Sequence, residues 1–241
     1  MKLFLCAPRG IILSAVLAVA APTFAADGDV LVFGGTGQLG SHVVKALVLA
    51  GEDVTVFARA TSNRERLKGL SVAYIIGDAL KESEVEVAFK TSAFRAVVNA
   101  LAGGADEGDF YNIAQEHMDR WAKKTGVEQM ILHSSIGVGE SMAIYPKFML
   151  PRTGEALRQK EIAEGHLRAS GLNYTIIRNG ILVPHETPAT GNAILTENQM
   201  LLLPVTRADL ALFTVHCLNN PECAGKTYHA IDESLPMRGG R

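Results

Sequence analysis

Three glycines at a spacing of three, Gly34, Gly37 and Gly40, are the residues whose type and spacing most clearly suggest a chemical role. A loop without side chains can turn tightly at its first glycine, let the backbone approach a pyrophosphate at the second, and let the next helix pack closely at the third. Free N–H groups at the start of that helix then face the phosphates. The alternative is a glycine-rich turn with no ligand, but the position between an apolar run and a helical pattern favours a dinucleotide site. The predicted phosphate loop is Gly34-Gly35-Thr36-Gly37-Gln38-Leu39-Gly40.

The residues after the second apolar run indicate which dinucleotide binds. An NAD-preferring protein usually has an acidic residue there, which hydrogen-bonds the ribose hydroxyls and repels a 2′-phosphate. This chain has Arg59 at that point and Arg64 further on, and a guanidinium can bind a 2′-phosphate through two hydrogen bonds. NADP is therefore the predicted cofactor and NAD the less favoured one, with a solvated loop arginine as the alternative for Arg59. Asp78 follows the third run, where its carboxylate either accepts from the adenine amino group or caps the next helix.

These residues must be positioned by alternating strands and helices. Apolar β-rich runs occupy residues 29–33, 54–57, 72–76, 96–99, 129–133 and 174–178, and helical patterns occupy 38–50, 109–125 and 153–170. Apolar strands separated by helices predict an α/β fold, a Rossmann-type doubly wound parallel sheet with helices on both faces. Such sheets bind ligands at the carboxyl ends of their strands. We expect one domain over residues 26–241, in which the irregular stretch 182–205 forms a small C-terminal substrate-facing region.

Several blocks of the chain resemble the short-chain dehydrogenase/reductase superfamily, in its atypical NmrA-like, NAD(P)-binding branch. The phosphate loop has that branch's Gly-Gly-Thr-Gly-x-x-Gly form, and the best match covers residues 160–164 and 167–178. Residues 122–127 and 133–135 look like the branch's helix and fifth strand, and residues 206–211 and 225–228 look like its C-terminal helix and last strand. Together these blocks are more specific than the glycines alone, and they extend over nearly the whole chain after residue 25.

The catalytic pattern of that superfamily is incomplete in this chain. Active reductases place a tyrosine four residues before a lysine on one helix, where the ammonium lowers the tyrosine pKa and prepares it to exchange a proton. Lys160 is present, but Ala156 stands where the tyrosine belongs, and Asn179 replaces the usual proline after the sixth strand. Tyr145 lies upstream in a loop, at a spacing that gives no support for the role.

Hydride transfer remains possible without that tyrosine, because the nicotinamide itself carries the chemistry. The resemblance implies that Lys160 binds the ribose hydroxyls beside the nicotinamide and that Ser135, preferred to Ser134, hydrogen-bonds a substrate carbonyl, the proton coming from solvent. The alternatives are a solvated Lys160 beside Glu164 and serines that only cap the end of a strand. His133 is expected to be packed or hydrogen-bonded rather than catalytic.

The N-terminal residues and the composition bear on localisation and partners. Residues 1–25 have the anatomy of a secretory signal peptide, with a positive start, an apolar stretch at residues 11–21 and small residues ending at Ala25. A periplasmic or secreted protein is expected, with no stable membrane insertion after cleavage, and a cytoplasmic protein is the alternative. The net charge of −2 gives no basic field that would attract nucleic acid.

Two of the three cysteines, Cys217 and Cys223, flank a short turn. They could pair in an oxidising compartment, but two cysteines make no disulfide framework, and a buried Cys217 with an incidental Cys223 is the favoured interpretation. The third, Cys6, belongs to the predicted signal peptide. No cysteine and histidine cluster has the spacing of a metal site.

Two functions from different classes fit this sequence. The first is an NADPH-dependent oxidoreductase that transfers hydride to a small carbonyl or conjugated substrate without the usual tyrosine, and Lys160 and the two serines favour it. The second is a non-catalytic dinucleotide-binding sensor, scaffold or assembly factor, which the missing tyrosine favours. A sugar-nucleotide epimerase is weakened by the short C-terminal region. The small-molecule substrate, the oligomeric state and the means by which an exported protein would obtain NADPH stay open at this point.

Overall fold

The computed structural model describes residues 29–103 and 108–237, so the predicted signal peptide lies outside the described residues. In this part of the chain no helix is long and apolar enough to cross a membrane. Three-residue and six-residue 3-10 turns join several of the elements. The helices and strands are β1 (Asp29–Phe33), α1 (Gln38–Leu49), β2 (Val54–Ala58), β3 (Ala73–Ile76), α2 (Glu82–Thr91), β4 (Phe94–Asn99), α3 (Phe110–Thr125), β5 (Gln129–Ser135), α4 (Leu150–Ala169), β6 (Asn173–Asn179), β7 (Ile181–Leu182), β8 (Ile194–Thr196), β9 (Pro204–Val205), α5 (Arg207–Cys217) and β10 (Lys226–Ile231).

The central sheet has the strand order β3-β2-β1-β4-β5-β6-β10-β8. Every neighbouring pair in it is parallel except β10 and β8, which are antiparallel. The chain builds outward from β1 in one direction and from β4 in the other, so the order reverses between these two strands. A doubly wound sheet binds its ligand at this reversal, outside the carboxyl ends of the strands. The predicted Rossmann-type fold is therefore confirmed.

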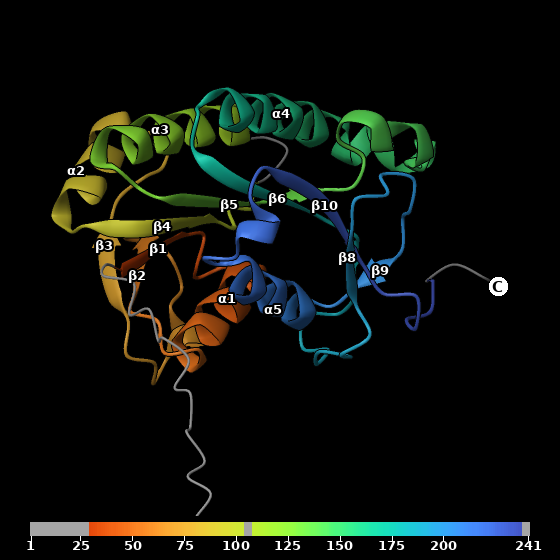
Figure 1. The fold of residues 1–241 in the computed structure, drawn as a ribbon, viewed down its shortest axis with the longest axis horizontal. Helices are drawn as coiled ribbons and strands as arrows, with labels where there is room; N and C mark the ends of the chain where they lie inside the picture. The colour runs from red at the N-terminus through yellow and green to blue at the C-terminus, as the bar shows by residue number, and fades with distance from the viewer. Residues whose placement is uncertain (1–28, 104–107, 238–241) are drawn as a thin grey trace, which may run out of the picture.

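Helices cover both faces of the sheet, with α1 and α5 on one face and α2, α3 and α4 on the other (Figure 1). Successive side chains of β1 point to opposite faces of the sheet, so they pack alternately against the helices on one face and on the other. Val30 and Val32 pack in the cluster with α1 and α5, whereas Leu31 and Phe33 pack in the cluster with α2, α3 and α4. Both clusters are apolar, which is why the strand reads as a continuous apolar run.

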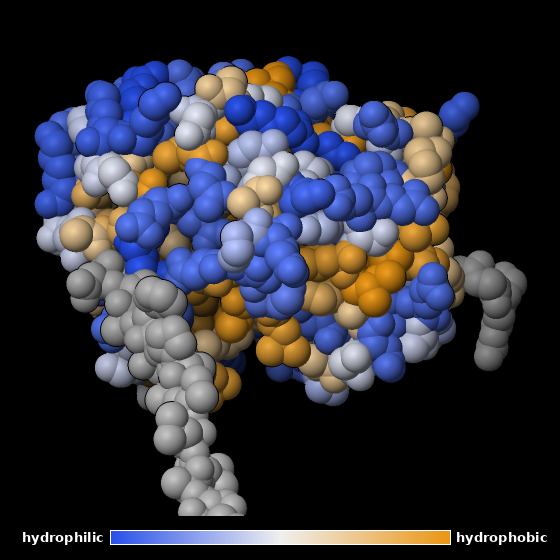
Figure 2. All heavy atoms as spheres, in the orientation of Figure 1, coloured by the Kyte–Doolittle hydropathy of each residue, from blue (hydrophilic) through white to orange (hydrophobic). Residues whose placement is uncertain are grey.

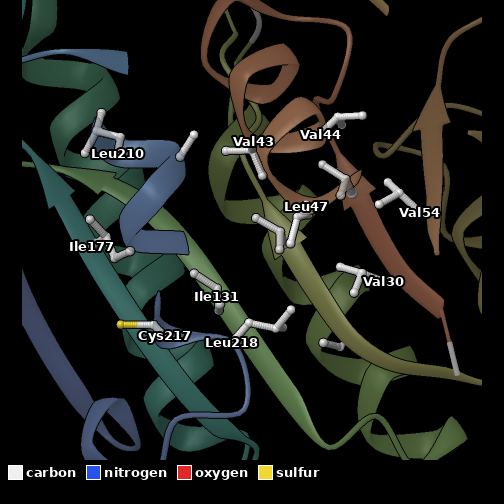
Figure 3. Close-up of a cluster of buried hydrophobic side chains, with 14 of the residues drawn as sticks. Val30, Val43, Val44, Leu47, Val54, Ile131, Ile177, Leu210, Cys217 and Leu218 are labelled. Atoms are coloured by element: carbon white, nitrogen blue, oxygen red, sulfur yellow. The ribbon is translucent and has the colours of Figure 1, made fainter. Parts of the chain in front are cut away.

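The layer of α1 and α5 closes over the centre of the sheet (Figure 3). Leu47 from α1 and Leu210 from α5 belong to the same buried cluster as Val30, Ile131 and Ile177 of the strands. All five side chains have no exposed surface. This packing fixes α1 against β1, and it thereby fixes the loop that joins them.

Four elements were not expected from the sequence: helix α2, strand β8, and the short strands β7 and β9, which pair with each other. Helix α2 buries only Val85, Ala88 and Phe89, an apolar stripe of about one turn, and charged residues make up much of its remaining surface. Strand β8 lies in the stretch expected to be irregular, and its three residues are too few to show an alternating pattern. Its antiparallel pairing with β10 makes the sheet mixed rather than wholly parallel.

Cys217 and Cys223 form a disulfide, so the favoured interpretation that they do not pair was wrong. Helix α5 ends at Cys217, and Asn219 adopts a left-handed conformation with φ of 57°. This turn brings the two Cα atoms to 5.4 Å. Gln129 of β5 fixes it from the sheet, because its side-chain amide donates to Cys217 O and accepts from the Asn219 N–H. A left-handed asparagine and a long-range glutamine contact are not evident in local sequence, so the pairing could not be read from spacing alone.

Candidate functional site

A cavity of about 760 Å³ opens at the carboxyl ends of the parallel strands. It is a suitable size for a ligand site, since such pockets span roughly 300–1,000 Å³. It occupies the place where a doubly wound sheet binds a dinucleotide. Most of the predicted site residues line it, namely Gly34, Thr36, Gly37, Gln38, Leu39, Arg59, Asp78, Ser135 and Lys160.

The glycines of the phosphate loop meet close backbone contacts. Gly34 has φ of +76°, and a Cβ there would lie 2.5 Å from Ala100 O, at the end of β4. A Cβ on Gly40 would lie 2.1 Å from Gly34 O, so α1 packs tightly against the loop itself. Gly35 faces the core, where a Cβ would lie 2.9 Å from the Val56 side chain. Gly35 and Gly40 therefore shape the loop from behind, while Gly34 and Gly37 also line the cavity.

The start of α1 presents a site for an anion. Gly37 is the N-cap residue, and no described side chain caps the helix or places an acid in its first turn. Gly37 N–H bonds back to Gly34 O at 2.9 Å, and Ser41 N–H begins the helical pattern by donating to Gly37 O at 3.0 Å. The N–H groups between them point toward the cavity end of the helix, where the helix dipole favours negative charge.

Arginines gather at the end of the cavity next to β2. Arg59 is exposed there, directly after the strand, as predicted. Arg64 is elsewhere, with its guanidinium carbon 4.7 Å from the centroid of the Tyr74 ring, so the expectation that Arg64 adds to this subsite was wrong. Arg66 lines the cavity instead, together with Ser62. The 3-10 turn over Glu65–Leu67 changes the direction of successive side chains, which spacing alone did not reveal.

Asp78 lines the cavity after β3, and its carboxylate already has one partner. Its Oδ1 accepts from the Leu80 N–H at 3.0 Å, while its own N–H donates to Glu84 Oε2 at 2.7 Å. It does not cap α2, whose N-cap residue is Lys81. Asp78 therefore stabilises the turn before the helix.

Lys160 lies at the opposite end of the cavity, on α4. Its Nζ is 4.1 Å from the centroid of the Tyr111 ring, and Ala156 one turn earlier provides no hydroxyl. The side chain is only partly exposed, and burial lowers the pKa of its ammonium to about 8, against the opposing pull of Glu164. A lysine in this state can release its proton in mildly alkaline solution and hydrogen-bond a ligand hydroxyl in either form.

Replacing Lys160 with methionine is expected to stabilise the fold at pH 7 by about 1 kcal/mol. The lowered pKa would correspond to a burial cost of about 3 kcal/mol for the Lys160 ammonium. The expected gain is smaller, because the side chain is partly exposed and because the methionine loses the contact of the ammonium with the Tyr111 ring. Because the folded-state pKa is below the unfolded one, the cost is complete below pH 8 and fades as pH rises to about 10.5. Urea unfolding at pH 7 and pH 10.5 should show the difference shrinking. Exposed Lys147→Met is the control, and a gain from Lys160→Met that grows with pH would contradict a burial cost at this lysine.

The adjacent serines at the end of β5 have different surroundings. Ser134 is buried, and its Oγ donates to Glu164 Oε1 at 2.5 Å. Glu164 has no exposed side-chain surface and also accepts two hydrogen bonds from Arg178, at 3.1 and 2.7 Å. Ser135 is partly exposed in the cavity and donates only to the neighbouring Ile136 O at 3.0 Å among the described contacts. Ser134 is thus committed to a buried network, and Ser135 is better placed to meet a ligand.

Two further residues line the cavity near this end. Tyr145 stacks against Gly137, where a Cβ would lie 2.5 Å from its ring, and its hydroxyl donates to Thr153 Oγ1 at 3.2 Å. Arg207 begins α5 and donates from Nη1 to Val183 O at 2.7 Å. No spacing in the sequence assigns either one to the site, because Tyr145 lies in an irregular segment and Arg207 is brought there by the packing of α5.

His133 behaves as the sequence suggested. It is buried, with Nε2 2.8 Å from Thr214 Oγ1 and Nδ1 3.1 Å from Asn179 Oδ1. Burial lowers its pKa to about 4, so the ring is neutral near pH 7. Over residues 29–103 and 108–237, no group of three or more His, Cys, Asp or Glu side chains could hold a metal ion.

The surface changes character near one mouth of the cavity. Figure 2 shows polar residues over most of the visible face and apolar residues gathered where β8 and β9 lie in Figure 1. Leu182 of β7 and Ile194 of β8 remain 40% and 46% exposed, and Leu182 also lines the cavity. This end of the site therefore offers apolar contact area to a ligand.

Comparisons with known proteins agree with this geometry. A family model described as NAD(P)H-binding matches residues 34–221. The solved structure of ChuY, an anaerobillin reductase from Escherichia coli O157:H7, is 27% identical with a TM-score of 0.77, over 87% of this chain and 99% of ChuY. The photosystem II assembly factor Ycf39 of Synechocystis is 25% identical over 84% of this chain, which spans only 62% of Ycf39. A short-chain dehydrogenase/reductase from Veillonella parvula, solved with NADP, shares the fold at 17% identity and a TM-score of 0.67, over 86% of this chain and 95% of that one.

Proposed function

The chain belongs to the NAD(P)H-binding family, among the atypical short-chain dehydrogenase/reductase proteins, and on this premise we propose that it is an NADPH-dependent oxidoreductase. Its substrate would be a small carbonyl or conjugated compound. The observation that carries the proposal is one continuous cavity that joins the phosphate loop, at one end, to Ser135 and Lys160 at the other. Beyond the phosphate loop the cavity continues to apolar side chains such as Leu182 and Leu202, which would contact a substrate.

Each group has a specific role in this proposal. The N–H groups at the start of α1 bind the pyrophosphate. Lys160 hydrogen-bonds the ribose hydroxyls next to the nicotinamide, and Ser135 donates to the substrate carbonyl, which polarises it toward hydride attack. The bound cofactor supplies the hydride. Solvent at the open mouth supplies the proton, since Ala156 provides none.

The preference for NADPH over NADH follows from the charge at the end of β2. Arg59 and Arg66 both line the cavity there, and Ser62 adds a hydroxyl. No carboxylate follows β2 directly to repel a 2′-phosphate, and guanidinium groups bind phosphate oxygens through paired hydrogen bonds. Asp78 follows β3 rather than β2, and its carboxylate is partly engaged by the Leu80 N–H.

Arg59→Ala and Arg66→Ala are each expected to weaken NADPH binding by about tenfold and NADH binding hardly at all. Each removes a charge-assisted hydrogen bond of about 1.5–3 kcal/mol, at the lower end here because both side chains are exposed. Titration followed by nicotinamide fluorescence measures both affinities. Arg64→Ala is the matched control, because that guanidinium lies over Tyr74 outside the cavity. Equal losses for the two cofactors would contradict the assignment.

Hydride transfer needs its own test. Enzyme saturated with NADPH is mixed with aldehydes, quinones and linear tetrapyrroles, and nicotinamide absorbance is followed; the tetrapyrroles are included because ChuY is an anaerobillin reductase. If the wild type oxidises NADPH, and Ser135→Ala and Lys160→Met do so more slowly although they too are saturated with NADPH, the result would support the reductase. If the protein binds NADPH tightly but none of the three classes of compound leads to NADPH oxidation, the result would favour the second candidate, a non-catalytic assembly factor or sensor. Ala156 in place of a tyrosine, and the likeness to the assembly factor Ycf39, are the observations that favour that candidate.

A further inference from the structure

A short segment after β7, residues 183–187, is hydrogen-bonded to β9, α5, α1 and the turn that holds Arg66, and we call it the strap. It leaves the cavity wall at Leu182, and Arg207 of α5 donates to Val183 O at 2.7 Å. Two residues further on, the strap crosses α1, where His42 Nε2 lies 3.2 Å from His185 O. The rings of these two histidines meet edge to face at 5.3 Å. The strap therefore runs from the apolar side of the cavity, past the first turns of α1, toward the arginines after β2.

His185, in the middle of the strap, also contacts Arg66. Arg66 Nε donates to His185 Nε2 at 3.3 Å, which joins residues 119 positions apart in the chain. The neighbouring acid does not compete for Arg66, because Glu65 pairs with Lys68 at 3.2 Å. Within the described part of the chain no carboxylate forms an ion pair with Arg66, and the hydrogen bond that its side chain donates there uses Nε rather than the two terminal nitrogens.

An arginine held at Nε is prepared to bind an anion. Its long side chain loses rotamer freedom on binding, and a partner that fixes the chain beforehand reduces that cost. The two Nη groups are the pair that grips phosphate oxygens, and they are the pair that His185 leaves unused. Arg66 also lines the cofactor cavity beside Arg59 and Ser62, so a fixed guanidinium would face the 2′-phosphate subsite.

The His185 ring has a second partner that competes with Arg66. Glu186 Oε1 lies 3.1 Å from the same Nε2, and the Glu186 side chain is 88% exposed. Neutral Nε2 can accept from Arg66, whereas a proton on Nε2 would be donated to Glu186 and would leave Arg66 without its acceptor. The other charged or titratable groups around the ring are His42 and Lys45 of α1 and Glu65 and Lys68 beside Arg66.

We propose that His185 is a positioning residue for cofactor choice, which holds Arg66 in the orientation that binds the 2′-phosphate. The inference rests on the proposed preference for NADPH and extends it to a residue far from the phosphate loop in sequence. The strap thereby links the apolar side of the cavity with the arginines that bind the ribose phosphate.

The test compares 2′,5′-ADP with 5′-AMP as probes, because they differ only in the 2′-phosphate and need no turnover. By calorimetry, His185→Ala should weaken 2′,5′-ADP binding about three- to tenfold, the range expected for one lost hydrogen bond, and change 5′-AMP binding less than twofold. His185→Gln should largely restore selectivity, since an amide oxygen can accept from Arg66 Nε. Glu186→Ala is the control within the strap: it removes the competing partner of His185 and should leave selectivity at or above that of the wild type. His185→Ala combined with Arg66→Ala should lose no more than Arg66→Ala alone.

The outcomes separate this inference from the proposed function. Equal losses for both probes, or additive losses in the double variant, would overturn the role of His185. Wild-type protein that binds 2′,5′-ADP no better than 5′-AMP would overturn it as well, along with the NADPH preference. Selective binding of 2′,5′-ADP that depends on His185, in a protein that never oxidises NADPH, would leave the inference standing and reject only the reductase. Thermal unfolding of each variant is measured to check that a loss of binding is not due to misfolding.

Discussion

Gly34→Ala is expected to lower the free energy of unfolding by about 2–5 kcal/mol and to abolish measurable dinucleotide binding. A left-handed alanine costs about 1–2 kcal/mol, and a methyl group forced into a packed site costs about 1–3 kcal/mol more. The methyl group would lie 2.5 Å from Ala100 O, which is backbone and cannot rotate away. Either the loop or the end of β4 must move, and both line the cavity.

Gly51→Ala is the control that separates the effect of the close contact with Ala100 from the effect of a left-handed alanine. Gly51 has φ of +86°, close to that of Gly34, but a Cβ there would meet nothing within 4 Å. The control should therefore show the strain alone and bind NADPH as the wild type does. Urea unfolding and fluorescence titration of the two variants measure both quantities. Equal destabilisation by the two alanines would show that the approach to Ala100 has no energetic consequence.

Glu164→Ala is expected to destabilise the protein by about 3–5 kcal/mol, the cost of leaving a buried charge without its partner. The Glu164 carboxylate is fully buried and accepts from Ser134, from Arg178 through two hydrogen bonds, and from Arg168 at 2.7 Å. Its removal leaves Arg178, itself only 5% exposed, with the Gln199 side chain as an acceptor at 2.8 Å.

The same variant should disturb the site, because Ser134 is next to Ser135 on β5. Glu155→Ala, on the same helix, is the control: its carboxylate binds Arg158 three residues on but is exposed to solvent. Its effect on stability should be far smaller, since exposed pairs contribute little. Chemical unfolding measures the difference. A loss from Glu164→Ala no larger than that from Glu155→Ala would show that the buried network is not needed for folding.

The parallel core of the fold was predictable, because buried strands leave a clear trace in sequence. The run at residues 29–33 coincides with β1, and the run at 174–178 lies within β6. Both faces of these strands are covered, so the apolar run is continuous and bounded by polar or glycine residues. Helix α2 and strand β8 left no such trace, since one buries three side chains and the other has three residues in all.

The parts of the candidate site that require a particular residue type for their backbone conformation were predictable. The orientation of side chains toward or away from the cavity was less predictable. Only glycine fits the positive φ and close approach at Gly34, so the loop was visible in the sequence. Arg64 and Arg66 are equally plausible by their spacing from β2, and a 3-10 turn decides which faces the cavity. The contact between Arg66 and His185 joins distant segments, and no local pattern predicts it.

Strand β8 has a consequence for how molecules of this protein can meet. Without it, β10 would be the last strand of the sheet, and its unpaired backbone groups would form a template on which a strand from another molecule could add. The antiparallel β8 pairs with residues His229 to Ile231, and the Gln199 side chain donates to Thr227 O at 3.1 Å in the part of β10 that β8 does not reach. Strand β8 then forms the edge itself, and its three residues offer a far shorter template than the six of β10. Edge-to-edge strand addition is therefore disfavoured on this side, and an oligomer that uses this end is expected to be built mainly from side-chain contacts.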